Sequence, residues 1–279
     1  MMECTGNIAF INDRQVSCRE VEQQSFEGLA VYEIFRVIDG IPVFLEDHLE
    51  RLYYSLDLEG KKIGETESDI ADRVRRLIEA NGMAGGKIKM VVVFAAGGEQ
   101  GSYDIWMYFT PFEPPSQEQY SKGVPVILCS AVRDDPNAKV MGTRARRLAD
   151  ARIQQTGAYE ALLLDQRGYI TEGSRSNVFF IQGEKLVTPP DSAVLQGIAR
   201  KNILRICQNE NLAVEIRKIH QNELAHLNGA FLSGTTPQIL PIQAIEQTVF
   251  SVNHPLIRHL IKAYQQRLEN YIHLRKLSE

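Results

Sequence analysis

The sequence predicts a mixed α/β (α+β) protein built from two lobes. Strand-like and helix-like segments are interspersed in both halves of the chain, and a proline-rich stretch at residues 111–119 separates those halves. The chain has 279 residues, which is enough for two packed lobes. We therefore expect a small N-terminal domain at 1–110, an interdomain linker at 111–123 and a larger domain at 124–279.

The first half begins with a weakly alternating strand at 7–12, followed by a hairpin turn at Asp13-Arg14. The dipeptide Asp39-Gly40 lies between apolar runs, a pattern typical of a β-hairpin. Acidic residues follow directly, where they favour a helix start at Glu46. The remaining elements expected here are strands at 32–38, 41–45, 88–96 and 104–110, helices at 46–58 and 68–80, and a glycine-rich turn at 96–101.

The linker is predicted from its prolines. Pro114 and Pro115 stand in series within residues 111–119, and two consecutive prolines disfavour both a helix and a central strand.

The second half repeats the mixture of strands and helices. Its last helix, predicted at 255–272, carries a continuous apolar stripe. The other helices are expected at 142–155 and 198–210. Strands are expected at 124–131, 158–165, 169–171, 177–181, 185–187, 213–217 and 230–233.

Composition excludes several classes of function. Lys and Arg total 31 and Asp and Glu total 35, so the formal charge is −4, which argues against general nucleic-acid binding. The longest apolar run, residues 90–96, is seven residues long, whereas a membrane-spanning helix needs about 20. The first ten residues lack a basic region followed by an apolar stretch. We therefore expect a cytoplasmic protein without a membrane or nucleic-acid partner.

The cysteines and histidines predict no metal site. Cys4, Cys18, Cys129 and Cys207 are scattered, without a Cys-x-x-Cys pair, and no His-x-x-x-His pair occurs. We expect each cysteine to be a free buried thiol, as fits a reducing compartment.

Several stretches offer groups that could hold a phosphate. Gly197 opens a predicted helix, so the N–H groups of Ile198 and Ala199 would lack an intrahelical partner. Residues 234–236, Gly-Thr-Thr, provide backbone and hydroxyl donors after a strand. Arg51 could complete the phosphate site with bidentate hydrogen bonds.

Two further residues suggest which phosphate compound would bind. Lys139 could form a Schiff base with an aldehyde, and Glu172 could keep a pyridine nitrogen protonated. Together with the phosphate donors, these groups describe a site for pyridoxal 5′-phosphate, the cofactor that serves as an electron sink in amino-acid chemistry.

At this point the chain resembles the class IV (fold type IV) aminotransferases, which include branched-chain and D-amino-acid aminotransferases and aminodeoxychorismate lyases. The resemblance extends from about residue 28 to residue 272. Its motifs occur in family order: Tyr32-Glu33, HLERL at 48–52 with Ser55, Lys139, YEALLLD at 159–165, TEGSRSNVFF at 171–180, Thr188-Pro189, LQGIAR at 195–200 and SGT at 233–235.

The resemblance implies a two-lobed fold with a small α/β domain and a larger pseudo-barrel domain. It implies that Lys139, 20 residues before Tyr159, is the catalytic Schiff-base lysine. Arg51 resembles the phosphate arginine, and Glu172 resembles the partner of the pyridine nitrogen. The other implied cofactor contacts are Ser176, Asn177, Leu195, Gly197, Ile198, Ala199 and Thr235. Ala199 stands where threonine is usual, so one hydroxyl contact to the phosphate is missing.

The implied substrate contacts are less typical of the family. The resemblance assigns Tyr32 from the small lobe and Thr235 and Thr236 from the large one. The Arg-x-His pair of D-amino-acid enzymes and the Tyr-x-Gly-Arg pattern of branched-chain enzymes are both missing. Arg36 and Lys89, on predicted strands of the small lobe, are cations that could bind a carboxylate instead.

The sequence thus predicts an aminotransferase that moves an amino group between an amino acid and a 2-oxo acid by a ping-pong mechanism. A branched-chain-like or broad donor is favoured. D-amino-acid transamination and a lyase-type β-elimination stay open as alternatives, and the resemblance implies a homodimer. A catalytically silent binding protein is disfavoured because Lys139 and Glu172 are both present.

Overall fold

The computed structural model describes residues 3–25, 27–96, 102–133 and 135–277. The chain divides into two compact units. Unit 1 consists of Met1–Glu113, Ala138–Met141 and Leu268–Glu279, and unit 2 consists of Pro114–Asn137 and Gly142–Arg267. The domain limits given above, 1–110, 111–123 and 124–279, stay a prediction.

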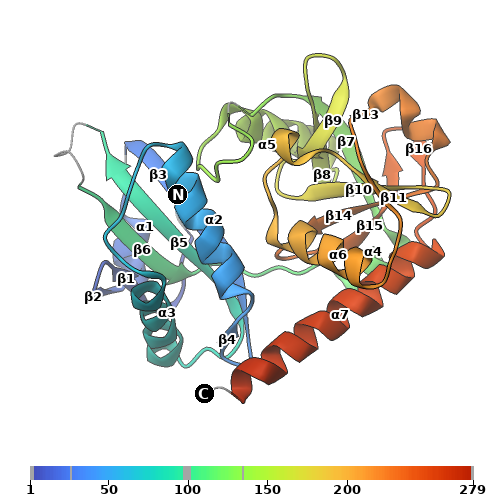
Figure 1. The fold of residues 1–279 in the computed structure, drawn as a ribbon. Helices are drawn as coiled ribbons and strands as arrows, with labels where there is room; N and C mark the ends of the chain where they lie inside the picture. The colour runs from blue at the N-terminus through green and yellow to red at the C-terminus, as the bar shows by residue number, and fades with distance from the viewer. Residues whose placement is uncertain (1–2, 26, 97–101, 134, 278–279) are drawn as a thin grey trace. The chain divides into compact units, whose positions relative to one another are not determined.

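Unit 1 is built on an antiparallel sheet of six strands in the order β2-β1-β6-β5-β3-β4 (Figure 1). Its long central strands β3 and β5 pair without interruption from Gly28–Ala95 to Val37–Gly86. The strands are β1 (Thr5–Ile11), β2 (Arg14–Ser17), β3 (Gly28–Ile38), β4 (Ile41–Pro42), β5 (Gly86–Ala95) and β6 (Asp104–Phe109).

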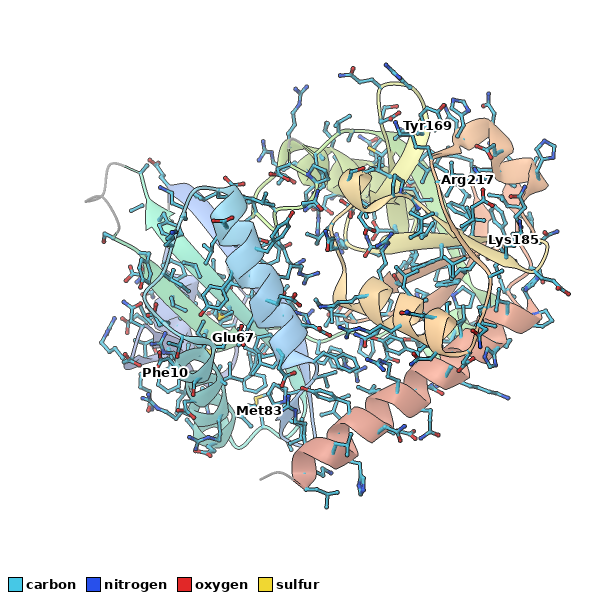
Figure 2. All side chains as sticks on the ribbon, in the orientation of Figure 1. Phe10, Glu67, Met83, Tyr169, Lys185 and Arg217 are labelled. Atoms are coloured by element: carbon cyan, nitrogen blue, oxygen red, sulfur yellow. A yellow bond between two sulfur atoms is a disulfide. The ribbon has the colours of Figure 1, made fainter. Side chains whose placement is uncertain are left out.

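Two helices cover one face of this sheet: α2 (Leu45–Leu58) and α3 (Glu67–Asn81). A capping box at Thr66 and Asp69 starts α3, and Gly82 with a positive φ ends it. The core between helices and sheet includes Phe10, with Met83 packed against it; both are labelled in Figure 2.

The residues of β3 alternate between the two faces of the sheet, as a strand requires. Val31 and Phe35 pack against the helices. Ala30 and Tyr32 lie on the opposite face, in a smaller cluster that includes Trp106 and is bordered by the short helix α1 (Cys18–Glu22). Odd-numbered residues of β3 therefore face α2 and α3, and even-numbered residues lie on the opposite face of the sheet.

A short segment from later in the chain, Ala138–Met141, joins the edge of β3. Lys139 accepts a hydrogen bond from Tyr32 N (3.0 Å), and Met141 N donates one to Ala30 (2.9 Å), with an antiparallel bridge between Val31 and Val140. The segment carrying Lys139 is therefore part of unit 1.

Cys4 and Cys18 form a disulfide in unit 1, so the expectation of four free thiols is wrong for these two. The β1–β2 hairpin explains the pairing: Cys4 lies just before β1 and Cys18 just after β2, with their Cα atoms 5.5 Å apart. Cys129 and Cys207 are buried free thiols, as expected.

Unit 2 contains a mixed ten-stranded sheet with the path β12-β11-β10-β14-β15-β7-β8-β9-β13, and β16 pairs with β15. Val187 near one edge and Ile219 at the other belong to the same core cluster, so the sheet curls on itself and confirms the predicted pseudo-barrel. Its strands are β7 (Val124–Ser130), β8 (Glu160–Leu164), β9 (Tyr169–Gly173), β10 (Asn177–Gln182), β11 (Lys185–Thr188), β12 (Val214–Ile216), β13 (Ile219–His220), β14 (Gly229–Gly234), β15 (Gln238–Ile245) and β16 (Thr248–Val249).

Helices pack against the strands of this sheet. α5 (Arg144–Thr156) connects the parallel strands β7 and β8 and packs Ala145 and Ala149 against them. α6 (Ile198–Asn209) contacts β14, and α4 (Gln117–Lys122) contacts β15. Two short 3₁₀ helices, η1 (Asp191–Ala193) and η2 (Gln221–His226), complete the unit.

The last helix, α7 (Pro255–Lys276), belongs to unit 2 up to Arg267 and to unit 1 from Leu268 onward. In unit 1, Tyr271 Oη donates to Glu46 (2.9 Å), and Lys276 pairs with Asp39 (2.8 Å). These contacts fasten the end of α7 to the β3–β4 turn and the start of α2.

Several expectations about secondary structure were wrong. The strand predicted at 41–45 ends at Pro42, and residue 45 already belongs to α2. Strand β2, which begins at Arg14, was not predicted.

Strand β15 lies centrally between β14 and β7 although it contains Pro241, and no strand was predicted there. α4 begins inside the proline-rich stretch, because the prolines precede its N-cap, Ser116, and so do not interrupt the helix. Of the predicted turn at 96–101, residues 97–101 lie outside the described residues. Within the described part of the chain, no helix is both long enough and apolar enough to cross a membrane.

Candidate functional site

The backbone of Lys139 is held on two sides. Its N–H donates to the hydroxyl of Ser55 on α2 (3.2 Å), and its carbonyl accepts from Tyr32 N on β3 (3.0 Å). Ser55 is completely buried. The lysine is therefore anchored to a helix and to a strand, although it lies in a loop.

The side chain of Lys139 lies against the ring of Tyr32, with Nζ 4.7 Å from the ring centroid. Lys89 Nζ from β5 is 5.6 Å from the same centroid. Each distance is in the range of a cation–π contact. The structure thus brings together three of the predicted site residues on the face of the sheet that α2 and α3 leave uncovered.

Arg36 lies further along this face, four residues after Tyr32 on β3, and is paired with Lys87 on β5. Its guanidinium carbon is 5.0 Å from the centroid of the Phe112 ring. Arg36, Lys87, Lys89 and Lys139 together concentrate positive charge on this face of the sheet, and such charge would attract carboxylates.

Arg51, on α2, lies on the other face of β3. Its Nε and Nη2 donate to the two oxygens of Glu33, each at 2.7 Å, and His48 Nδ1 lies 2.7 Å from Glu33 Oε2. Glu33, His48 and Arg51 are 0%, 2% and 8% exposed. The two hydrogen bonds to Glu33 hold the guanidinium group of Arg51 in one orientation, as is usual for a bidentate pair.

The charges of this triad follow from its surroundings. Burial raises the pKa of Glu33, but Arg51 and His48 lower it further, to about 2. Burial lowers the pKa of His48 and outweighs the opposing effect of Glu33. At neutral pH we therefore assign an ionised Glu33, a neutral His48 that donates to it, and a charged Arg51.

Glu172, at the end of β9 in unit 2, is a buried carboxylate with three donors. Its Oε1 accepts from Arg133 Nη1 (2.8 Å), and its Oε2 accepts from Leu195 N (3.0 Å) and from Asn177 Nδ2 (3.5 Å). The sequence predicted Glu172, Asn177 and Leu195 but not Arg133. A single arginine in a loop carries no pattern that distinguishes it from a surface residue.

Asn177 connects this carboxylate to the start of α6. Its Nδ2 also donates to Leu195 O (2.8 Å), and Gly197 packs so closely that a Cβ there would lie 2.0 Å from Asn177 Oδ1. The φ of Gly197 is −65°, which any residue adopts, so only the close approach requires glycine. Glu172, Asn177, Leu195 and Gly197 thus form one contiguous cluster.

The N-terminus of α6 has no side-chain cap. Gly197 occupies the N-cap position, and no side chain hydrogen-bonds there within the described residues. The predicted contacts Ile198 and Ala199 form the first turn and are 4% and 3% exposed. Free N–H groups at a helix N-terminus, together with the helix dipole, favour an anion such as phosphate.

Ser176 lies beside the cluster, but its hydroxyl donates to another buried carboxylate, Glu160 (3.1 Å). Glu160 also accepts from Ser174 Oγ (2.7 Å), from Arg175 N (3.2 Å) and from Ala161 N (2.9 Å). It therefore holds the loop after Glu172. Sequence reasoning missed this role, although an acidic residue within the apolar strand predicted at 158–165 was a signal.

The remaining predicted contacts, Thr235 and Thr236, lie in the turn between β14 and β15 and are half-buried. They follow Ser233, which pairs with Asn177 across β14 and β10. The described residues contain no cluster of three or more His, Cys, Asp or Glu side chains that could hold a metal ion.

Known proteins resemble the chain along nearly its whole length. Residues 30–245 match the family model "Amino-transferase class IV". The D-alanine aminotransferase of Bacillus licheniformis is 25% identical over 93% of this chain and 94% of that protein. The branched-chain-amino-acid aminotransferase of Pseudomonas aeruginosa is 26% identical over 85% of this chain and 83% of that protein.

The fold also matches solved structures. The branched-chain amino acid aminotransferase of Escherichia coli superposes with a TM-score of 0.84 at 20% identity, covering 95% of each chain. This likeness confirms the fold predicted from the sequence. The extent of the family match leads to one conclusion: the chain belongs to the class IV aminotransferases, a family of pyridoxal-phosphate-dependent enzymes.

Proposed function

We propose that this enzyme transfers an amino group between an amino acid, branched-chain-like or broad in kind, and a 2-oxo acid by a ping-pong mechanism. The observation that carries the proposal is the setting of Lys139. Its backbone is held by Ser55 and Tyr32, and its amine lies over the Tyr32 ring on a face that also presents Lys89. An amine fixed in this way is suited to both covalent and proton-transfer chemistry.

The residues present fit the cofactor. Lys139 would bond its aldehyde carbon, Glu172 would bind its pyridine nitrogen, and the uncapped start of α6 would bind its phosphate through Ile198 and Ala199. We assign Arg51 and Thr235 to the phosphate as well. Asn177, Leu195, Gly197 and Ser176 would contribute to this site. The hydrogen bond from Asn177 to Leu195, the close approach of Gly197 to Asn177 and the hydrogen bond from Ser176 to Glu160 support the proposal.

When bound, pyridoxal phosphate supplies a ring that accepts the electrons of the substrate's Cα–H bond. The protein supplies the base. Lys139 Nζ, in its uncharged form, would take the proton from the substrate's Cα and would later return it to carbon C4′ of the cofactor. Glu172, in its ionised form, would keep the proton on the pyridine nitrogen.

Substrate carboxylates require donors, and two sets are proposed. The Thr235-Thr236 turn offers backbone N–H groups and hydroxyls. Tyr32, Lys89 and Arg36 offer a phenol and two cations on the face of the unit 1 sheet that lies opposite α2 and α3. The second set suits a donor or acceptor that bears a second carboxylate.

A second candidate is D-amino-acid transamination. The observation in its favour is the similarity to the D-alanine aminotransferase of Bacillus licheniformis, which extends over 93% of the chain.

One assay tests the proposal and ranks the candidates. The protein is loaded with pyridoxal phosphate and incubated with 2-oxoglutarate and, separately, with both enantiomers of Leu, Val, Ala and Glu (the last with pyruvate as acceptor). Amino transfer from L-Leu or L-Val supports the branched-chain-like hypothesis, whereas transfer from D-donors alone overturns it. Release of pyruvate from a substrate with a leaving group on Cβ, without any amino transfer, would indicate β-elimination. Lys139→Ala must abolish both transfer and the cofactor's absorption band, and transfer by that variant would refute the site.

We further propose a cytoplasmic homodimer. The family resemblance supports the dimer. The free thiols of Cys129 and Cys207 fit a reducing compartment, whereas the Cys4–Cys18 disulfide is unusual for one and is therefore the bond to test. Sedimentation analysis would reveal the assembly. Thiol labelling of protein from lysed cells would reveal whether Cys4 and Cys18 are bonded there.

A further inference from the structure

The carboxylate of Glu172 has a charged partner as well as neutral ones. Arg133 Nη1 donates to Oε1 at 2.8 Å, and the two side chains are 13% and 3% exposed. Backbone Leu195 N and the amide of Asn177 donate to the other oxygen, Oε2. Because two neutral donors already orient the carboxylate, the distinct contribution of Arg133 is its positive charge.

The position of Arg133 is set by unit 2 itself. It lies three residues after β7, which pairs in parallel with β8, and β8 pairs with β9, the strand that carries Glu172. The ion pair therefore joins the loop after β7 to the end of β9, and β8 lies between these two strands in the sheet. In a site with little exposure, the solvent screens such a pair weakly.

A guanidinium on one oxygen changes how the carboxylate behaves as a proton acceptor. The cation stabilises the ionised form of the acid, so the carboxylate competes less strongly for a proton that it shares with another base. Without the cation, a carboxylate buried among neutral groups favours its protonated form.

We propose that Arg133 is a positioning residue that keeps Glu172 ionised and thereby leaves the shared proton on the pyridine nitrogen of the bound cofactor. This inference rests on the proposed function, in which Glu172 is the partner of that nitrogen. Loss of Arg133 lets the proton pass to Glu172, and the ring then withdraws electrons less strongly. Arg133 thus acts on the reaction without touching the substrate.

The test measures where the proton resides. The protein is loaded with pyridoxal phosphate that carries ¹⁵N in the ring, and the ¹⁵N chemical shift distinguishes a protonated from an unprotonated pyridine. The variants are Arg133→Met, which removes the charge, Arg133→Gln, which removes it but keeps a donor, and Arg133→Lys, which keeps it. Arg175→Met is the matched control, because that side chain is 53% exposed and pairs with Asp150.

We expect a protonated nitrogen in the wild type, in Arg133→Lys and in Arg175→Met. In Arg133→Met and Arg133→Gln the shift should move towards that of an unprotonated pyridine, and turnover should fall by about tenfold or more. Having two neutral variants keeps the test open if one of them fails to fold.

The outcomes separate this inference from the function beneath it. A wild-type protein that holds no cofactor overturns the proposed function and this inference with it. A wild-type protein that holds the cofactor, together with an unchanged ¹⁵N shift in the folded, loaded neutral variants, overturns the inference alone. A loss of turnover without a change in the shift would mean that Arg133 has only a structural role.

Discussion

Glu33 binds Arg51 through two parallel hydrogen bonds, Nε to Oε1 and Nη2 to Oε2, each 2.7 Å long. Glu33 lies on β3 and Arg51 on α2, so the pair crosses the core of unit 1 between sheet and helix. Neither residue is more than 8% exposed. The arginine predicted to bind a phosphate is therefore oriented by a carboxylate before any ligand arrives.

The buried Glu33 should make stability depend on acid. Its pKa is about 2 in the folded protein, against an ordinary value of 4.5, so the unfolded chain takes up its proton first. The resulting stabilisation, about 3 kcal/mol, is fully present above pH 4.5 and is lost as the pH falls towards about 2. Glu33→Gln should therefore be less stable at neutral pH and should lose less stability over this interval.

Urea unfolding of both proteins at a series of pH values checks this prediction. Glu118→Gln is the control, since Glu118 is 71% exposed and should leave the curve unchanged. If wild type and Glu33→Gln lost stability in parallel on acidification, the assigned ion pair would be incorrect.

Glu160 should be essential to the loop that carries Glu172. Glu160→Gln puts an amide where four donors now meet two carboxylate oxygens, so some donors lose their acceptor. We expect a loss of about 2–3 kcal/mol in the free energy of unfolding and faster release of the cofactor. Thermal unfolding and cofactor retention after gel filtration measure the two effects. Glu184→Gln, at an exposed position in unit 2, serves as the control; equal behaviour of the two variants would disprove the role.

Gly197 should tolerate no side chain. A Cβ there would lie 2.0 Å from Asn177 Oδ1, so Gly197→Ala must displace either Asn177 or the start of α6. We expect a loss of about 1–3 kcal/mol in stability and weaker phosphate binding, measured as the dissociation constant of pyridoxal phosphate. Gly85→Ala is a suitable comparison, because a Cβ at Gly85 meets nothing within 4 Å. Unaltered cofactor affinity in Gly197→Ala would argue against the phosphate site at α6.

Ala199 offers a gain-of-function test of the same helix start. Ala199→Thr adds a hydroxyl beside the uncapped N-terminus, and Ala199→Val adds the same bulk without it. A hydrogen bond to the phosphate contributes about 1 kcal/mol, so the threonine variant should bind the cofactor several-fold more tightly than the valine variant. The comparison is between the two variants, because residue 199 is 3% exposed and either substitution adds volume. Equal affinities would place the phosphate elsewhere.

Local patterns allowed much of the fold to be predicted. The Asp39-Gly40 turn, the helix predicted at 68–80 and the acidic start of α2 each depend on neighbouring residues, which the sequence displays directly. Strand β15 was missed for the opposite reason. Pro241 contradicts the local pattern of a central strand, and only pairing with β14 and β7 reveals the strand.

The candidate site likewise contains residues that local motifs predicted and residues that only the folded structure reveals. Lys139 and Glu172 stand in motifs whose order along the chain identified the family. Arg133 and Glu160 act through side-chain contacts with residues 39 and 14–16 positions away, and no spacing rule covers such pairs. The Cys4–Cys18 disulfide was missed likewise, because it depends on the hairpin between the two cysteines.

The attachment of residues 138–141 to β3 has a consequence for how the enzyme folds. The strands of the unit 1 sheet all lie within the first 109 residues, whereas the hydrogen bond from Tyr32 to Lys139 joins positions more than 100 residues apart. Closing so long a loop costs entropy that local pairing does not, and contacts of this kind form slowly. The sheet can therefore assemble before the lysine is in place. During refolding, capture of the cofactor should lag behind the appearance of β-structure.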